Sequence, residues 1–236
     1  HRDLHSFPTR RSSDLVANTG SVLPVLPANF EVKFVDFPPN SVLEQVEHDS
    51  EAFRDAVRFD KGRRVLAGML HAGETGHFMV VDDDDFVSSR LTSFVAENPK
   101  CNGWYILKGF IWSDGGKLLY NYSDFSMFCG TSLIIRADLY NLPKSIEEAD
   151  YNYICKMLGS HIFIRNHLVD INTPLEPLPF NGAIYRVAHS DSLSKSPGIF
   201  KLYFLKRNLL KRPFELIRRI FRLKLITASI SKEFWG

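Results

Sequence analysis

Residues 82–85 are four consecutive aspartates, and they stand directly behind an apolar run at residues 78–81. Four carboxylates at the end of a buried strand repel one another, so a hard divalent cation with oxygen ligands is the natural partner for them. Apolar residues then return at helical spacing, namely Phe86, Val87, Leu91, Phe94 and Val95. A solvated acidic turn is the alternative, which this quick return of apolar residues disfavours. A strand, an acidic corner and a helix together predict an open α/β sheet with its ligand at the strand end.

Residues 1–15 (HRDLHSFPTRRSSDL) match, codon by codon, the translation of a common DNA sequencing adapter. We therefore treat them as an artefact without structure and exclude them from fold reasoning. The adapter replaces the natural start, so we expect the chain to be truncated at its N-terminus. The expected organisation is an enzyme core at residues 16–200 and a basic tail at residues 201–236.

Composition favours a globular chain long enough for one domain with a full core. Its three cysteines, Cys101, Cys129 and Cys155, fit neither a metal spacing nor a disulfide framework, which favours a reducing, cytoplasmic location. No apolar run is long enough to span a bilayer.

Patterning along the chain predicts alternating strands and helices. We expect a strand at 31–37, helices at 43–59 and 65–70, and a helix at 88–97. Strands at 104–112 and 117–122 are expected to form a hairpin around Asp114-Gly115-Gly116, followed by a strand at 128–136. An acidic helix should begin at 145 and continue to 158, because acids in a first turn suit the helix dipole.

Three segments in this order resemble one enzyme family. VVDDDDFVS is similar to the strand-end signature of GT-A fold glycosyltransferases, especially their exostosin-like branch. GWYILKGFIWSDGG and FCGTSLIIRADLY are similar to bacterial proteins of the same fold. The resemblance covers roughly residues 20–194 and implies a Rossmann-like α/β fold with a mixed, mostly parallel sheet and helices on both faces. The part of that fold that holds the nucleotide base would precede Asn18, so the fold is expected to be incomplete at its N-terminus.

The resemblance implies transfer of a sugar from a nucleotide-diphosphate sugar to a hydroxyl of a carbohydrate or lipid-linked acceptor, as in polysaccharide or glycolipid assembly. Mn²⁺ or Mg²⁺ would bridge the two phosphates and stabilise the charge on the leaving group. This assigns the metal to Asp82 and Asp84, with Asp82 and Asp83 near the donor; a shift of one, to Asp83 and Asp85, stays open. His189 is the candidate third ligand, and a hydrogen-bonded loop histidine is its equal alternative.

Other roles follow from the resemblance in the same way. Glu148 and Asp150 are the candidate catalytic carboxylates, as base or as charge stabiliser, and a favourable helix start is the alternative for them. Gly130 and Thr131 would line the donor sugar. His161 is a weaker candidate for the metal or acceptor, and His71 and His77 are expected to be structural. Trp104 and Trp112 would stack on a sugar, although aromatic residues of this kind more often lie in a core.

The last segment is strongly basic. From residue 201 onward ten lysines and arginines stand against two glutamates, interleaved with leucines, isoleucines and phenylalanines, and Pro213 should divide the segment into two helices. Such a segment is expected to lie on an anionic membrane surface, with packing on the body or on a partner as the alternative. Nucleic acid binding is disfavoured because the body is acidic. A nucleotidyltransferase and a non-catalytic membrane-binding module remain the rival functions.

Overall fold

The structure, a computed structural model, describes residues 13–236 apart from 39, 48–49, 190–196 and 206–210. The chain forms two compact units. The first unit holds the chain up to Thr75 together with Asn141–Ser160, and the second holds Gly76–Tyr140 and His161–Gly236. The fold is mixed α/β, as the sequence predicts. No helix among the described residues is long and apolar enough to cross a membrane.

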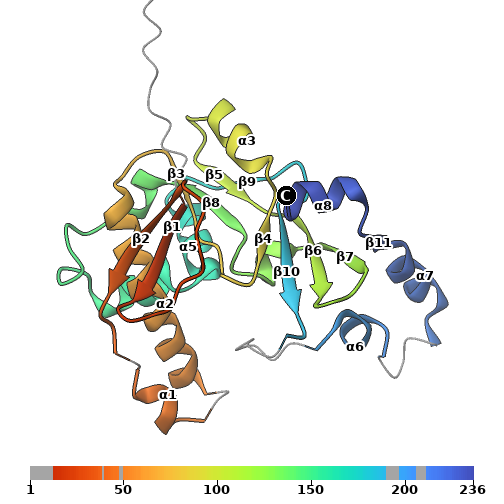
Figure 1. Ribbon diagram of the computed structural model, residues 1–236, viewed down its shortest axis with the longest axis horizontal. Coiled ribbons are helices and arrows are strands. Elements are labelled where there is room, and N and C mark those ends of the chain that lie inside the picture. Colours follow the sequence, from red (N-terminus) through yellow and green to blue (C-terminus); the bar gives the residue numbers. More distant parts are fainter. Residues whose placement is uncertain (1–12, 39, 48–49, 190–196, 206–210) are drawn as a thin grey trace, which may run out of the picture. The chain divides into compact units, whose positions relative to one another are not determined.

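The first unit pairs two parallel strands with a long helix (Figure 1). Its elements are β1 (Ser13–Asn18), β2 (Phe30–Val35), α1 (Val42–Gln45), α2 (Glu51–Ala72), α4 (Tyr151–Tyr153) and the π-helix η3 (Ile154–Leu158). β2 confirms the strand expected near residues 31–37. β1 begins at Ser13, so the last three residues of the adapter-like segment are part of a strand, contrary to our exclusion of residues 1–15. Residues 1–12 lie outside the described part of the chain.

The prediction of two helices at 43–59 and 65–70 is wrong, because α2 continues without a break from Glu51 to Ala72. Gly62 lies in its middle, where glycine costs about 1 kcal/mol relative to alanine. It is required there by a close approach: a Cβ at this position would stand 2.3 Å from the backbone oxygen of Ile154. From the sequence alone, Gly62 indicates a break in the helix. The structure explains why a glycine stands inside a continuous helix, because the π-helix packs against this position.

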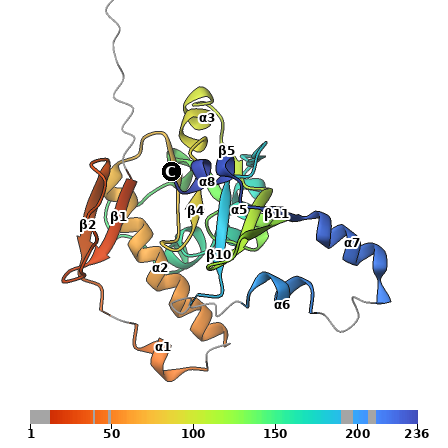
Figure 2. The ribbon, with the colours of Figure 1, turned by 45° about the vertical axis from the view of Figure 1, so that its right-hand side comes forward.

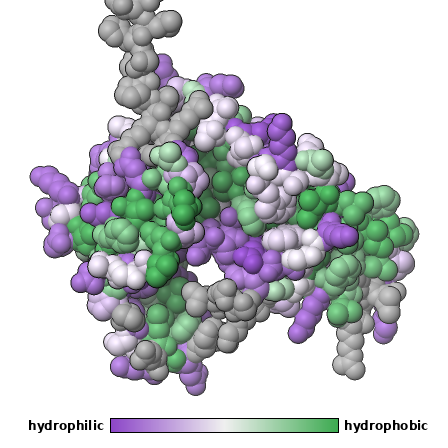
Figure 3. All heavy atoms as spheres, viewed as in Figure 1, coloured by the Kyte–Doolittle hydropathy of each residue, from purple (hydrophilic) through white to green (hydrophobic). Residues whose placement is uncertain are grey.

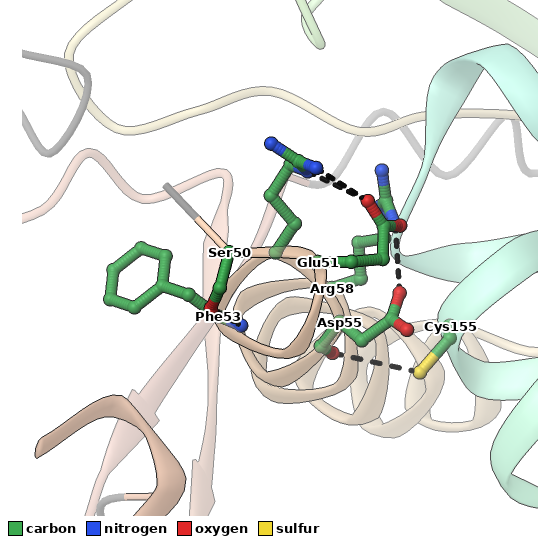
Figure 4. A network of polar contacts seen from close by, with 7 residues as sticks. Ser50, Glu51, Phe53, Asp55, Arg58 and Cys155 are labelled. Carbon is green, nitrogen blue, oxygen red and sulfur yellow. Dashed lines mark hydrogen bonds and ion pairs between the residues drawn. The ribbon is translucent and has the colours of Figure 1, made fainter. Parts of the chain in front are cut away.

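The start of α2 is fixed by a capping residue and an arginine (Figure 4). Ser50 accepts a hydrogen bond from the Phe53 N–H at 3.1 Å, as N-cap residues do. The Arg58 guanidinium lies 2.8 Å from Glu51 Oε1 and 2.8 Å from Asp55 Oδ1. These contacts lower the pKa of Glu51, mainly through the hydrogen bond from Arg58.

The second unit contains two sheets. Their strands are β3 (His77–Met79), β4 (Phe86–Val87), β5 (Gly103–Tyr105), β6 (Lys108–Ser113), β7 (Leu118–Ser123), β8 (Leu133–Arg136), β9 (Glu176–Pro177), β10 (Ala183–Val187) and β11 (Leu223–Leu225). One sheet has the order β11-β7-β6-β10-β4 and the other β3-β8-β5-β9. The helices are α3 (Leu91–Glu97), α5 (His161–Asp170), α6 (Ile199–Tyr203), α7 (Pro213–Phe221) and α8 (Ala228–Phe234), with short 3₁₀ turns η1 (Phe125–Met127) and η2 (Ala137–Tyr140).

The expected mostly parallel sheet is wrong. Of the strand pairs in the described chain, β1–β2, β10–β6 and β5–β9 are parallel, whereas the other five are antiparallel. The β6–β7 hairpin around Gly115 confirms the predicted turn, and a tight turn of this kind can join only antiparallel strands. Trp104, expected in the same strand as Trp112, belongs to β5 in the other sheet.

Helices cover both faces of the five-stranded sheet, as predicted. Phe110, Leu119 and Ile184 point to one face, where Phe234 of α8 packs against them. Ile111 and Tyr120, each one residue further along its strand, and Val187, three residues after Ile184, point to the other face, where Ile199 of α6 packs. This alternation follows from the two-residue period of a strand.

The expected boundary at residue 201 is wrong, because the end of the chain belongs to the body of the second unit. β11 pairs with β7 as the edge strand of the five-stranded sheet. In α8, Glu233 accepts a hydrogen bond from the Ser88 hydroxyl, and its carbonyl accepts one from the Ser89 N–H at 3.1 Å. Both views show α8 beside β4 (Figures 1 and 2). Pro213 does begin a new helix, as predicted.

Candidate active site

The four aspartates form a tight turn that connects the two sheets of the second unit. The strand before them, β3, ends at Met79, and β4 begins at Phe86. The Asp85 N–H donates to the Asp82 carbonyl at 3.1 Å and closes the turn. The Asp82 N–H donates to Thr131 Oγ1 at 2.9 Å, so a buried hydroxyl from the loop before β8 holds the start of the turn.

Strand pairing brings three distant segments to one edge of the five-stranded sheet. β10 runs antiparallel to β4 and parallel to β6. The residues before β4 therefore lie beside the residues after β10 and after β6. This edge collects Asp84 and Asp85 from the acidic turn, Asp114 from the β6–β7 turn, and Arg186 and His189 from the end of β10.

His189 contacts Asp84 directly. Its Nε2 lies 2.8 Å from Asp84 Oδ2, although the two residues are 105 positions apart in the sequence. The His189 side chain is 5% exposed and that of Asp84 is 26% exposed. The preceding residue, Ala188, has a φ of 62°, in the left-handed region. A residue other than glycine pays about 1–2 kcal/mol there, and the chain accepts this strain where it turns His189 toward the acidic turn.

Asp85 is the perturbed carboxyl of the turn. Burial raises its pKa to about 6, and the charges of Asp82 and Asp84 add to that shift. Hydrogen bonds from the Thr131 and Cys129 side chains oppose it. The Cys129 thiol donates to Asp85 Oδ2 at 3.3 Å, and burial raises the pKa of this thiol, so it stays protonated as a donor.

Arg186 links Asp85 to Asp114. Its backbone N–H donates to Asp85 Oδ1 at 3.3 Å. Its guanidinium makes two bonds to Asp114, 3.1 Å from Nε and 2.9 Å from Nη2, which is the paired geometry that arginine forms with a carboxylate. The hydrogen bond from Arg186 lowers the pKa of Asp114. Sequence reasoning missed both residues, since Asp114 was visible only as part of a turn and Arg186 only as a strand residue.

Some residues expected to bind the donor are structural or peripheral. Thr131 is fully buried and its hydroxyl supports the acidic turn, which leaves no surface for a sugar. Gly130 is half-buried beside it, and Asp83 is exposed at the tip of the turn. Trp104 is buried in a core cluster of the second unit, and Trp112 is partly buried against another cluster, which is the core position that such aromatic residues more often take.

The expected catalytic carboxylates, Glu148 and Asp150, belong to the first unit. The expected helix start at 145 is wrong, because the helical segment begins at Tyr151. Asp150 is its N-cap and accepts a hydrogen bond from the Tyr153 N–H at 3.0 Å. Glu148 is exposed in the turn before it. The capping role that acids commonly take at helix starts therefore accounts for Asp150.

The remaining histidines are distributed over both units. His77 Nε2 lies 2.9 Å from the Cys101 carbonyl oxygen, and burial lowers its pKa, which fits the structural role expected for it. His161 begins α5, away from the acidic turn in sequence. All three cysteines are free, as predicted.

Among the described residues, one group of three potential metal ligands brings its ligand atoms within 4.8 Å of one another: Asp14, Glu31 and His71, in the first unit. Asp14 falls in the adapter-like segment, so we assign no function to this group. Asp82 does not join Asp84 and His189 in such a group. At the acidic turn, Asp84 Oδ2 and His189 Nε2 therefore form a pair of adjacent ligand atoms, and Asp82 does not add a third.

The edge of the sheet thus carries a hydrogen-bonded carboxylate–imidazole pair, a buried carboxyl of raised pKa and an arginine held by a carboxylate. Such a set can bind a divalent cation and place positive charge near an anionic group. No family model, curated protein or solved structure matches this chain.

Proposed function

We propose that this protein is a metal-dependent glycosyltransferase of the GT-A fold, which transfers a sugar from a nucleotide-diphosphate sugar to a hydroxyl of a carbohydrate or lipid-linked acceptor. The observation that carries the proposal is the contact of 2.8 Å between Asp84 and His189. The family resemblance names these two residues as metal ligands from opposite ends of the core. Their contact supports that pairing, because it brings an oxygen and a nitrogen ligand from distant segments close enough to hold one cation.

The chemistry of the donors favours Mn²⁺ over Mg²⁺, since imidazole nitrogen is a poor ligand for the harder ion. Asp84 Oδ2 and His189 Nε2 would hold the cation, which would take the place of the proton between them. When bound, it would stabilise the charge that the leaving diphosphate gains. Asp82 is proposed for the ribose or the outer metal shell, as the resemblance implies.

The other residues of the edge have supporting roles in this proposal. Thr131 fixes the backbone of the acidic turn by accepting from Asp82 N–H. Arg186, held by Asp114, contributes positive charge at the same edge of the sheet. The resemblance alone carries the assignment of Glu148 and Asp150 to catalysis. We also propose a cytoplasmic location, because three free cysteines suit a reducing compartment.

Manganese binding tests the proposal without a known substrate. The electron paramagnetic resonance signal of free Mn²⁺ should fall when the chain is added. Asp84→Ala and His189→Ala should each weaken binding by ten-fold or more, since each removes one ligand. The matched control is Asp83→Ala, which removes an exposed carboxylate of the same turn. Release of nucleoside diphosphate from a panel of nucleotide-sugars then measures turnover.

Unchanged Mn²⁺ affinity in both Asp84→Ala and His189→Ala would refute the metal site. A loss of binding in Asp83→Ala with normal binding in Asp84→Ala would move the ligands by one residue, to the alternative register. Mn²⁺ binding without release of any nucleoside diphosphate from the panel would contradict sugar transfer while retaining the metal site.

A further inference from the structure

Helix α7 packs on the body with its polar side. Arg219 forms an ion pair with Glu215 one turn earlier and donates to the backbone oxygen of Tyr203. Arg222, just after the helix, donates to Ser123 Oγ at 3.0 Å. An amphipathic helix of a globular protein ordinarily turns its apolar side to the core and its charges to water. Here the arrangement is reversed.

The apolar side of α7 is consequently exposed. Phe214 is 87% exposed and Phe221 is 76% exposed, and Leu225 of β11 continues the surface at 67%. With Ile217 and Ile220, also exposed, these residues form what we call the apolar ridge. Figure 3 shows hydrophobic side chains gathered over α7, and both ribbon views place α7 beyond the edge strand β11 (Figures 1 and 2). A continuous exposed apolar surface on a helix is typical of a contact site.

A basic pocket adjoins this ridge. It is open to solvent, has a volume of about 270 Å³ and is lined by Lys108, Asn121, Ser123, Phe221, Arg222 and Lys224. Three of these residues are cationic, two offer neutral hydrogen-bonding groups, and none is acidic. Phe221 belongs to both the pocket and the ridge, so the two features are continuous. Lysine and arginine side chains with hydroxyl and amide groups are the groups that bind a phosphate.

We propose that the apolar ridge and the basic pocket together dock the protein on an anionic lipid surface. The ridge would enter the boundary between headgroups and acyl chains, and the pocket would take the phosphate of a lipid headgroup. This proposal does not depend on the proposed sugar transfer.

The basic residues around the ridge favour an anionic lipid surface over a protein partner. Besides the pocket, exposed Lys211, Arg212 and Arg218 flank the ridge, whereas Glu215, the acidic residue within α7, is already paired with Arg219. Large apolar side chains beside a cluster of basic side chains complement an anionic bilayer, which offers an apolar interior beneath negative headgroups.

The structure narrows the membrane surface expected from the sequence. The basic residues from 201 onward were expected to act together on the membrane, yet Arg219 and Arg222 bond to the body. Lys206, Arg207, Leu209 and Leu210 lie outside the described residues. The contact is assigned instead to the ridge and to Lys108, a residue of β6 that the sequence did not connect with this surface.

Co-sedimentation with vesicles tests the proposal on the whole chain. The protein should sediment with vesicles of phosphatidylglycerol and phosphatidylcholine but remain in solution with phosphatidylcholine alone. Phe214→Ser with Phe221→Ser should reduce binding roughly ten-fold or more for each phenylalanine. The matched control is Val169→Ser, which changes an exposed apolar residue of α5 and should have no effect.

Charge variants test the pocket separately. Lys108→Gln and Lys224→Gln should each reduce binding roughly five-fold at physiological salt. Lys232→Gln, an exposed lysine of α8 outside the pocket lining, serves as their control. Thermal melts should show that these surface variants remain folded. A reporter variant, Phe221→Trp, should be quenched by lipids with brominated acyl chains, whereas Val169→Trp should not.

Several outcomes would overturn the assignment. The first is a chain that stays in solution with anionic vesicles at low salt, and the second is binding that the ridge variants leave unchanged. Release by inorganic phosphate at matched ionic strength would assign the pocket to a free anion. If light scattering shows a dimer that the double phenylalanine variant converts to a monomer, the ridge is an interface between two copies.

Discussion

Replacing Asp85 by Asn should stabilise the protein at neutral pH more than at acid pH. Asp85 is surrounded by protein, and its burial raises its pKa from 3.8 to about 6. Its ionised form is therefore less favourable in the folded state than in the unfolded chain. Asparagine has nearly the same shape and can accept the hydrogen bonds from Thr131 and from the Arg186 N–H, but it carries no charge.

The sign and size follow from linkage between folding and protonation. A carboxyl whose folded pKa is raised contributes stability that is fully present below pH 3.8 and is lost as the pH rises through about 6. A shift of about two pKa units corresponds to about 3 kcal/mol. The free energy of unfolding of Asp85→Asn minus that of the wild type should therefore increase by about 2–3 kcal/mol from pH 4 to pH 7.5.

Urea unfolding at a series of pH values, with a chelator present to keep cations from the acidic turn, measures this difference. Asp83→Asn is the matched control, because it removes one charge of the same turn from an exposed position. A difference between Asp85→Asn and the wild type that stays constant from pH 4 to pH 7.5, or that falls as the pH rises, would refute the assignment. Titration of the Asp85 carboxyl by NMR should show a midpoint near pH 6.

Two further substitutions test packing through the free energy of unfolding in urea. Phe234→Ala should lower the free energy of unfolding by about 3–5 kcal/mol, because Phe234 of α8 is buried against the five-stranded sheet. Phe214→Ala is its control and should have little effect, because Phe214 is exposed. Equal small effects of the two variants would mean that the C-terminal segment is a loose tail. Gly62→Ala should lower the free energy of unfolding by about 1–3 kcal/mol, because the alanine Cβ would stand 2.3 Å from the Ile154 backbone oxygen. This cost should outweigh the better helix propensity of alanine. A stabilised variant would contradict the close approach.

Local patterns in the sequence determined a good part of this protein. The apolar run before the aspartates, the turn at Gly115 and the start of a helix at Pro213 are short-range signals, and the structure contains all three features. They are readable because side-chain periodicity and turn chemistry depend on neighbours within a few residues. The family resemblance named Asp82, Asp84 and His189 as metal ligands, and the structure brings Asp84 and His189 into contact.

Only the tertiary structure decided how these pieces combine. Strand direction, and with it the mostly antiparallel sheets, depends on which distant strands meet. The same holds for the burial of Asp85 and for the pairing of Arg186 with Asp114. The basic C-terminal segment is the clearest case. Its charges and leucines predicted a basic amphipathic tail, on a membrane or packed on the body, whereas α8 packs into the core and α7 shows its apolar side to solvent. The sequence pattern predicts an amphipathic helix, but only contacts between distant residues determine which of its two faces is buried.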